Sequence, residues 1–143
     1  MDLTSGFQIE SPNVFVPWDI SEAELKSLLD EHGLRQVTHG YYTMSCVSLG
    51  GLSHKLGFHF RPRHHGMLNE LEFFRQSYDN LRASFDEFQK HFENSFGKPA
   101  TEQSETDEFP AFSWSLNGVQ IVHYVFDRFG LEEHMRIMKC RVD

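Results

Sequence analysis

The first stretch with helical periodicity lies between positions 21 and 33, where apolar residues recur at the three-to-four spacing of a helix. Ser21 and Glu24 form the pattern of a capping box, in which each side chain satisfies a backbone N–H of the other residue. Gly33 can adopt the left-handed conformation that ends many helices. The apolar stripe consists of Leu25, Leu28 and Leu29. This pattern predicts one short amphipathic helix that begins after Ser21 and ends before Gly33.

The same order of signals returns in the second half of the chain. Ser84 and Glu87 repeat the capping-box pattern, and Gly97 followed by Pro99 ends the segment. The apolar stripe here consists of Phe85, Phe88, Phe92 and Phe96. We therefore predict a second helix that begins after Ser84, ends at Gly97 and directs a phenylalanine-rich face to the core.

Apolar runs that are typical of strands follow each predicted helix. These runs cover residues 37–49, 55–61 and 68–74 after the first helix, and residues 112–116, 119–126 and 134–140 after the second. Asn117-Gly118 separates two of them. Asn-Gly is a strong signal for a two-residue hairpin loop, because both loop positions need a positive φ. This loop would pair Phe112 with His123 across the hairpin.

Together these patterns predict an α+β fold that contains a tandem duplication of a helix-plus-antiparallel-meander unit. The helices would pack on one face of the sheet or sheets. The two units span about 18–76 and 82–141 of a single domain over residues 1–143, and residues 1–17 form an N-terminal arm. Ser21 matches Ser84 in this alignment, and His59 matches His123. Any helix followed by a meander has a similar order of cap, glycine stop and turn residues, so duplication and coincidence both stay open.

Composition and charge narrow the classes of function. The net charge of −8 disfavours binding to nucleic acid phosphates and favours a basic protein partner. The first residues lack the basic and apolar regions of a signal peptide, and no run approaches the roughly eighteen apolar residues of a membrane span. Cys46 and Cys140 form no CxxC pair. We therefore expect a cytoplasmic protein without membrane contact.

The segment 101–109 is the strongest candidate for partner binding. It contains no basic residue and four carboxylates, namely Glu102, Glu105, Asp107 and Glu108. Acidic side chains on a loop can dock on a basic surface and speed association. The alternative interpretation is a solvated acidic loop without a partner.

Histidines provide the second group of candidates. His59 and His123 occupy matching places in the two units, and Arg61 lies near His59, so we take these three residues as a speculative polar site. A metal site among the histidines of residues 54–65 is disfavoured, because Arg61 and Arg63 would repel a cation. The other interpretation of His123 is a core residue whose polar atoms are satisfied. We assign no metal ligand, no cofactor and no catalytic residue.

Motifs of known catalytic chemistry are absent from the sequence, including GxSxG, the P-loop and GxGxxG. We therefore predict a non-enzymatic binding protein, either an acidic inhibitor or immunity-type module or a chaperone-type module, which caps a protein partner. One alternative is a small enzyme that depends on histidine or a metal. Another is a self-associating structural subunit, because exposed strand edges and abundant phenylalanine are compatible with a homodimer.

Overall fold

The computed structural model describes residues 1–61, 66–75, 80–102 and 108–141, and it has a mixed α and β fold. Its elements are, in chain order, β1 (Gly6–Ile9), β2 (Val14–Pro17), α1 (Glu22–Leu29), the 3₁₀ helix η1 (Asp30–His32), β3 (Arg35–Thr38), β4 (Tyr41–Ser48), β5 (Leu52–Phe60), β6 (Leu68–Phe74), α2 (Leu81–Phe96), β7 (Ala100–Glu102), β8 (Ala111–Leu116), β9 (Val119–Asp127) and β10 (Leu131–Lys139). None of the helices in these ranges is both long enough and apolar enough to cross a membrane.

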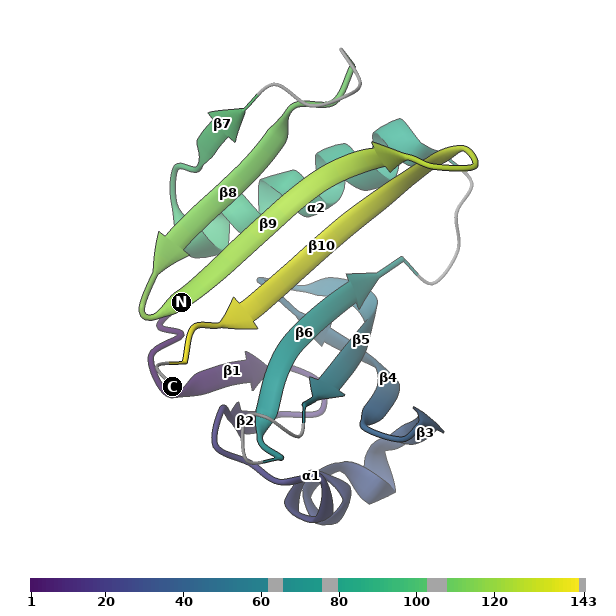
Figure 1. The fold of residues 1–143 in the computed structure, drawn as a ribbon, viewed down its shortest axis with the longest axis vertical. Helices are drawn as coiled ribbons and strands as arrows, with labels where there is room; N and C mark the ends of the chain where they lie inside the picture. Colours follow the sequence, from purple (N-terminus) through teal and green to yellow (C-terminus); the bar gives the residue numbers. More distant parts are fainter. Residues whose placement is uncertain (62–65, 76–79, 103–107, 142–143) are drawn as a thin grey trace.

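Eight strands form one antiparallel sheet with the order β3-β4-β5-β6-β10-β9-β8-β7. A meander of four strands follows each helix, β3 to β6 after α1 and β7 to β10 after α2. The last strands of the two meanders, β6 and β10, pair with each other in the middle of the sheet (Figure 1). A continuous sheet therefore joins the two halves of the chain, which the strand signals alone left undecided.

The hairpin of β8 and β9 has the predicted register. Phe112 pairs with His123, and the chain turns at Asn117 and Gly118. Both turn residues have a positive φ, 52° at Asn117 and 74° at Gly118, as a two-residue hairpin loop of this kind requires. The prediction is confirmed, because the local chemistry of the turn favours this register.

Helix α2 covers one face of the sheet with its phenylalanine stripe. Figure 1 shows α2 behind β8, β9 and β10. Phe88 and Phe92 are fully buried, and the Phe92 ring centroid lies 5.5 Å from that of Phe73 on β6 and 5.9 Å from that of Trp114 on β8. One helix thus contacts strands from both meanders, so its burial helps to hold the two halves together.

The first helix begins where the sequence predicts. The Ser21 side chain accepts a hydrogen bond from the Glu24 backbone N–H, and the Glu24 carboxylate accepts one from the Ser21 N–H, each at 3.2 Å. The helical turns end at Gly33, whose φ of +85° lies in the left-handed region. Leu25 and Leu29 are buried. The capping box and the glycine stop are therefore both confirmed.

The predicted start of the second helix is wrong by one turn. Asn80 is the N-cap, and its side chain accepts a hydrogen bond from the backbone N–H of Ala83. Ser84 lies inside the helix, where its hydroxyl donates to a carboxylate oxygen of Glu133 at 2.6 Å. Glu87 pairs with Arg75 and does not complete a capping box. A tertiary hydrogen bond therefore uses the serine that the local pattern assigned to the cap.

The single strand predicted over residues 37–49 is divided into β3 and β4. Gly40 lies between the two strands with φ of +77°, and a Cβ atom on it would approach the Phe60 carbonyl oxygen to 3.0 Å. The glycine thus allows a tight turn against the neighbouring strand. The predicted last strand, 134–140, begins earlier in the structure, at Leu131.

The residues interpreted as an N-terminal arm contain a hairpin of β1 and β2 that joins the core. Leu3, Phe7 and Ile9 are fully buried, and the indole N–H of Trp18 donates to the Leu3 carbonyl oxygen at 2.8 Å. An isolated two-stranded hairpin is only marginally stable in water. These buried side chains stabilise the hairpin by packing it against the rest of the molecule.

Candidate functional site on the uncovered face of the sheet

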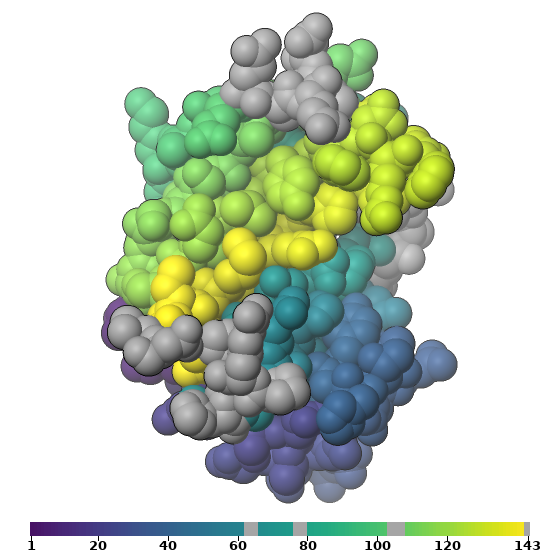
Figure 2. All heavy atoms as spheres, in the orientation of Figure 1, coloured from purple at the N-terminus to yellow at the C-terminus, as the bar shows by residue number. Residues whose placement is uncertain are grey.

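The sheet face opposite α2 has no helix over it among the described residues, and it carries a concentrated set of polar side chains. Successive residues of a strand point to opposite faces, so the residues next to the buried phenylalanines along each strand point away from α2. The side chains on this uncovered face at the middle of the sheet are Tyr41, His59, Glu70, Glu72, Tyr124, His134 and Arg136. Figure 2 shows the molecule in the orientation of Figure 1, with β10 in yellow across its middle.

The central cluster of this face consists of His59, Glu70, Glu72 and Arg136. The His59 Nε2 atom lies 2.9 Å from the nearest carboxylate oxygen of Glu72 and 3.8 Å from that of Glu70. The guanidinium of Arg136 lies 3.8 Å from Glu70 and 3.6 Å from Glu72. Strands β5, β6 and β10 each supply part of the cluster, so the register of the sheet fixes its geometry.

Two tyrosines flank the cluster, one stacked on His59 and the other on the neighbouring His134. The Tyr41 ring lies over His59 with centroids 4.3 Å apart, and the Tyr124 ring lies over His134 with centroids 5.1 Å apart. Burial raises the pKa of Tyr41, and the negative charges of Glu72 and Glu70 raise it further. The tyrosine therefore stays neutral while it restricts the orientation of the imidazole.

Electrostatics keep Glu72 ionised in this half-buried position. Burial alone would raise the pKa of Glu72, but the hydrogen bond from His59 and the charges of Arg136, His59 and His134 outweigh it, so the pKa is lowered. The central cluster therefore presents at least one carboxylate at neutral pH. Carboxylate and imidazole groups together can bind a cation, accept a proton or pair with a basic side chain.

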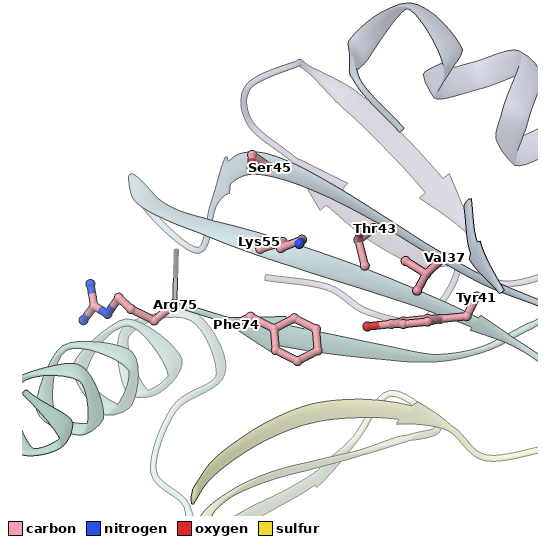
Figure 3. Close-up of a pocket in the computed structure, with 7 residues that line it drawn as sticks. All are labelled: Val37, Tyr41, Thr43, Ser45, Lys55, Phe74 and Arg75. Atoms are coloured by element: carbon pink, nitrogen blue, oxygen red, sulfur yellow. The ribbon is translucent and has the colours of Figure 1, made fainter. Parts of the chain in front are cut away.

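A shallow depression of about 590 Å³ lies on the same face beside Tyr41 (Figure 3). Its lining consists of Val37, Tyr41, Thr43, Ser45, Lys55, Phe74 and Arg75. Gly57 lies beneath it, and a Cβ atom there would come within 3.0 Å of the Tyr41 ring and 3.2 Å of the Phe74 ring. A side chain at position 57 would therefore displace the two aromatic rings by a few tenths of an ångström.

A second depression of about 570 Å³ borders His59 and Arg61. Two of the three residues of the speculative polar site therefore line one part of the surface. His123 does not join them, because it lies on the opposite face, fully buried beneath α2 with its ring centroid 4.1 Å from that of Phe85. A shift of one residue in register moves a side chain to the other face of the sheet. The alignment of the two units could therefore not predict whether both histidines lie on the same face.

His123 belongs to a buried polar network under α2. Its Nδ1 atom lies 2.8 Å from Gln89 Oε1, and its Nε2 atom lies 2.6 Å from a carboxylate oxygen of Glu133. The other carboxylate oxygen of Glu133 accepts from Ser84. Burial lowers the pKa of His123, although the hydrogen bond and the charge of Glu133 oppose that change. The network ties α2 to β9 and β10, and all of its residues are buried.

The hairpin end of the sheet is the second prominent surface. We use this name for the end that contains the β9–β10 turn, the last residue of β7 and Glu108. Its exposed side chains are Glu102, Glu108, Phe126, Asp127, Arg128, Phe129, Leu131 and Glu132. Phe129 is 95% exposed. Of the four acidic residues predicted to bind a partner, Glu102 ends β7 and Glu108 is exposed, whereas Glu105 and Asp107 lie outside the described residues.

The reasoning from sequence missed the central carboxylates and Arg136. A usable signal was present, since Glu70 and Glu72 alternate with the buried Leu71 and Phe73 in one predicted strand. Two acids on one strand face mark a polar patch. Their meeting with Arg136 depends on the pairing of β6 with β10, which no local pattern predicts.

Comparisons with known proteins give no relative for this chain. No protein-family model, no curated protein and no solved structure matches it.

Proposed function

We propose that this protein is a non-enzymatic binding domain, an acidic inhibitor, immunity-type or chaperone-type module, which caps a basic protein partner with the hairpin end of its sheet. The observation that carries the proposal is Phe129, a large apolar side chain at 95% exposure. Phe126 and Leu131 lie exposed on the two strands beside it. The register of β9 and β10 puts Phe126 and Leu131 on opposite faces of the hairpin, with Phe129 in the turn between the two strands. Large exposed apolar residues close to one another are typical of protein interaction sites.

Charge supports a basic partner. The exposed residues of the hairpin end include four acidic side chains, namely Glu102, Glu108, Asp127 and Glu132, and the chain has a net charge of −8. One basic side chain, Arg128, lies among them, with its guanidinium carbon 6.0 Å from the Phe129 ring centroid. Interfaces commonly combine an apolar centre with a polar rim. An acidic rim attracts a basic surface over distance and raises the association rate, and salt weakens that effect.

The experiment begins with affinity capture from a lysate of the native cells at low salt, followed by kinetics with the purified partner. We expect Phe129→Ala to raise the dissociation constant about tenfold or more, because aromatic anchors contribute most of the binding energy at such interfaces. The double variant Glu102→Lys/Glu108→Lys should slow association and flatten its dependence on salt.

The matched control is Asp30→Lys/Glu31→Lys, which makes the same change in net charge at exposed positions beside α1. This control should bind the partner nearly as the unchanged protein does. Equal loss of binding in the control, or no effect of Phe129→Ala, would contradict the proposed surface. Analytical sedimentation tests the alternative that the surface binds a second copy of this chain. A dimer that Phe129→Ala converts to a monomer would support that alternative.

We also propose that the fold arose by duplication of a helix-plus-meander unit. The identical order of a helix and four antiparallel strands in each half supports this origin. The antiparallel pairing of β6 with β10, which are equivalent strands, supports it as well, because a twofold arrangement brings equivalent strands together in that way. The match between His59 and His123 does not support it, since the two side chains lie on opposite faces.

A reducing compartment such as the cytoplasm fits this proposal. Cys46 and Cys140 are both free thiols, one buried and one exposed. Proteins that act in oxidising compartments more often hold their cysteines in disulfides.

A further inference from the structure

We propose that His59, Glu70 and Glu72 form a binding site for a divalent transition-metal ion of the zinc class on the uncovered face of the sheet. The ligand atoms that these three residues offer all lie within 4.8 Å of one another. One imidazole nitrogen and two carboxylate oxygens are ligands that zinc and its neighbours in the periodic table accept. Three protein ligands leave further positions of the ion open to solvent, as in zinc sites that bind water.

The geometry is close to that of a metal site. Ligand atoms bound about 2.1 Å from a tetrahedral ion lie about 3.4 Å from one another. The Nε2 atom of His59 is 2.9 Å from Glu72 and 3.8 Å from Glu70, which brackets that spacing. Small rotations of the two carboxylates therefore bring the three atoms around one ion without a change in the backbone.

Glu70 is the most deeply buried of the three proposed ligands, and among the described residues only two long ion pairs hold its carboxylate. Its side chain is only 8% exposed, and its charged neighbours His59 and Arg136 are both 3.8 Å away, beyond hydrogen-bond distance. Within the described part of the chain, no hydrogen bond to the Glu70 carboxylate is formed. Buried carboxylates are nearly always hydrogen-bonded or bound to a metal, because desolvation without a partner is costly. A cation beside His59 and Glu72 would satisfy this carboxylate.

The surrounding residues hold the ligands in place. His59 and Glu70 are direct cross-strand partners on β5 and β6, and Glu72 lies two residues further on the same face. The stacked Tyr41 ring limits rotation of the imidazole. The depression that borders His59 gives an ion a route from solvent. Ligands on rigid strands lose little conformational freedom when they bind an ion.

Arg136 neutralises part of the carboxylate charge and competes with a cation. Its guanidinium lies 3.6 to 3.8 Å from the two carboxylates, and its Nε atom is buried without a hydrogen-bond partner. These contacts are looser than the bidentate pairs that arginine forms at its strongest sites. Arg136 can therefore move aside when an ion binds, and its removal should strengthen metal binding.

The test is isothermal titration of Zn²⁺ into the full chain, purified without a histidine tag and treated with a chelator. We expect one ion per chain at this site. His59→Gln and Glu70→Gln should each weaken Zn²⁺ binding at least about tenfold, because loss of a direct ligand costs at least as much as loss of its supporting partner. Arg136→Met should tighten binding about thirtyfold, the effect of one unit charge removed from about 4 Å of a divalent ion in water. A general loss of structure would not produce a tighter variant.

The matched control is His32→Gln, which removes an exposed histidine from the 3₁₀ helix near α1. It should bind Zn²⁺ as tightly as the unchanged chain. The proposal is overturned if the chain binds no Zn²⁺, or if His59→Gln and Glu70→Gln bind it unchanged while their urea unfolding midpoints match the unchanged chain. It is also overturned if all histidine substitutions, His32→Gln included, reduce binding by similar amounts.

Discussion

His54 should make the protein less stable in mild acid. The side chain is fully buried on β5, where its Nδ1 atom contacts the Lys55 carbonyl oxygen at 3.2 Å and its Nε2 atom lies 2.5 Å from the Ser48 hydroxyl. Burial lowers the pKa of His54 from 6.5 to about 4, and the nearby His91 acts in the same direction. The hydrogen bond to Lys55 and the charge of Glu10 oppose the change but are weaker.

The sign and size of the effect follow from proton linkage. In the unfolded chain His54 binds a proton as the pH falls below 6.5, whereas in the folded chain it stays neutral until about pH 4. The unfolded state therefore binds more protons in this window, and the free energy of unfolding falls with falling pH. Between pH 7.5 and pH 5 the loss from this one group is about 2 kcal/mol, and it reaches about 3 kcal/mol below pH 4.

Urea denaturation at pH 7.5 and pH 5 measures this loss, with fluorescence of the buried Trp18 and Trp114 as the signal. The variant His54→Gln cannot titrate, so it should lose about 2 kcal/mol less than the unchanged protein over the same interval. His123, whose pKa is also lowered by burial, contributes equally to both proteins and cancels in the comparison. His32→Gln should retain the full loss. A loss in His54→Gln within about 0.5 kcal/mol of the unchanged protein would refute the reasoning.

Two further predictions concern the core and the thiols. Phe92→Ala removes a fully buried ring that contacts strands from both meanders. In urea denaturation it should lower the free energy of unfolding by about 3–5 kcal/mol. Lys90 is exposed on the same helix, and Lys90→Ala should change the free energy of unfolding by less than about 0.5 kcal/mol. Similar effects of the two substitutions would argue against this position for α2. Burial raises the pKa of Cys46 to about 12, so a thiol reagent should label only Cys140 in the folded protein and both cysteines in urea. Prompt labelling of folded Cys140→Ser would contradict the burial of Cys46.

Local signals in the sequence predicted the parts of the fold that short-range physics controls. The capping box of Ser21 and Glu24 needs only four residues of chain, and the Asn117-Gly118 turn needs only two residues with positive φ. The start of α2 was misplaced, because Ser84 resembles a cap locally but is bound to Glu133, which is distant in sequence. Equal local patterns can thus have different outcomes when a tertiary hydrogen bond competes for the same side chain.

Only part of the candidate site could be predicted from the sequence. The sequence indicated His59 and Arg61, which line one depression, and it indicated the exposed Glu102 and Glu108. It gave no reason to join Glu70 with Arg136, because these residues meet only where β6 pairs with β10. Pairing between strands far apart in sequence has no local signature.

The sequence by itself determined the two helices and most strands of the two meanders, the phenylalanine face of α2, the first helix cap, the Asn-Gly hairpin and the negative charge of the chain. These properties depend on residues that are neighbours along the chain. The tertiary structure alone decided that the two meanders form one sheet, that His59 and His123 face opposite sides and that a buried Glu70 stands beside His59. The physical reason is that the face of each strand residue and the partner of each sheet edge depend on register, and register is set by the packing of the whole core.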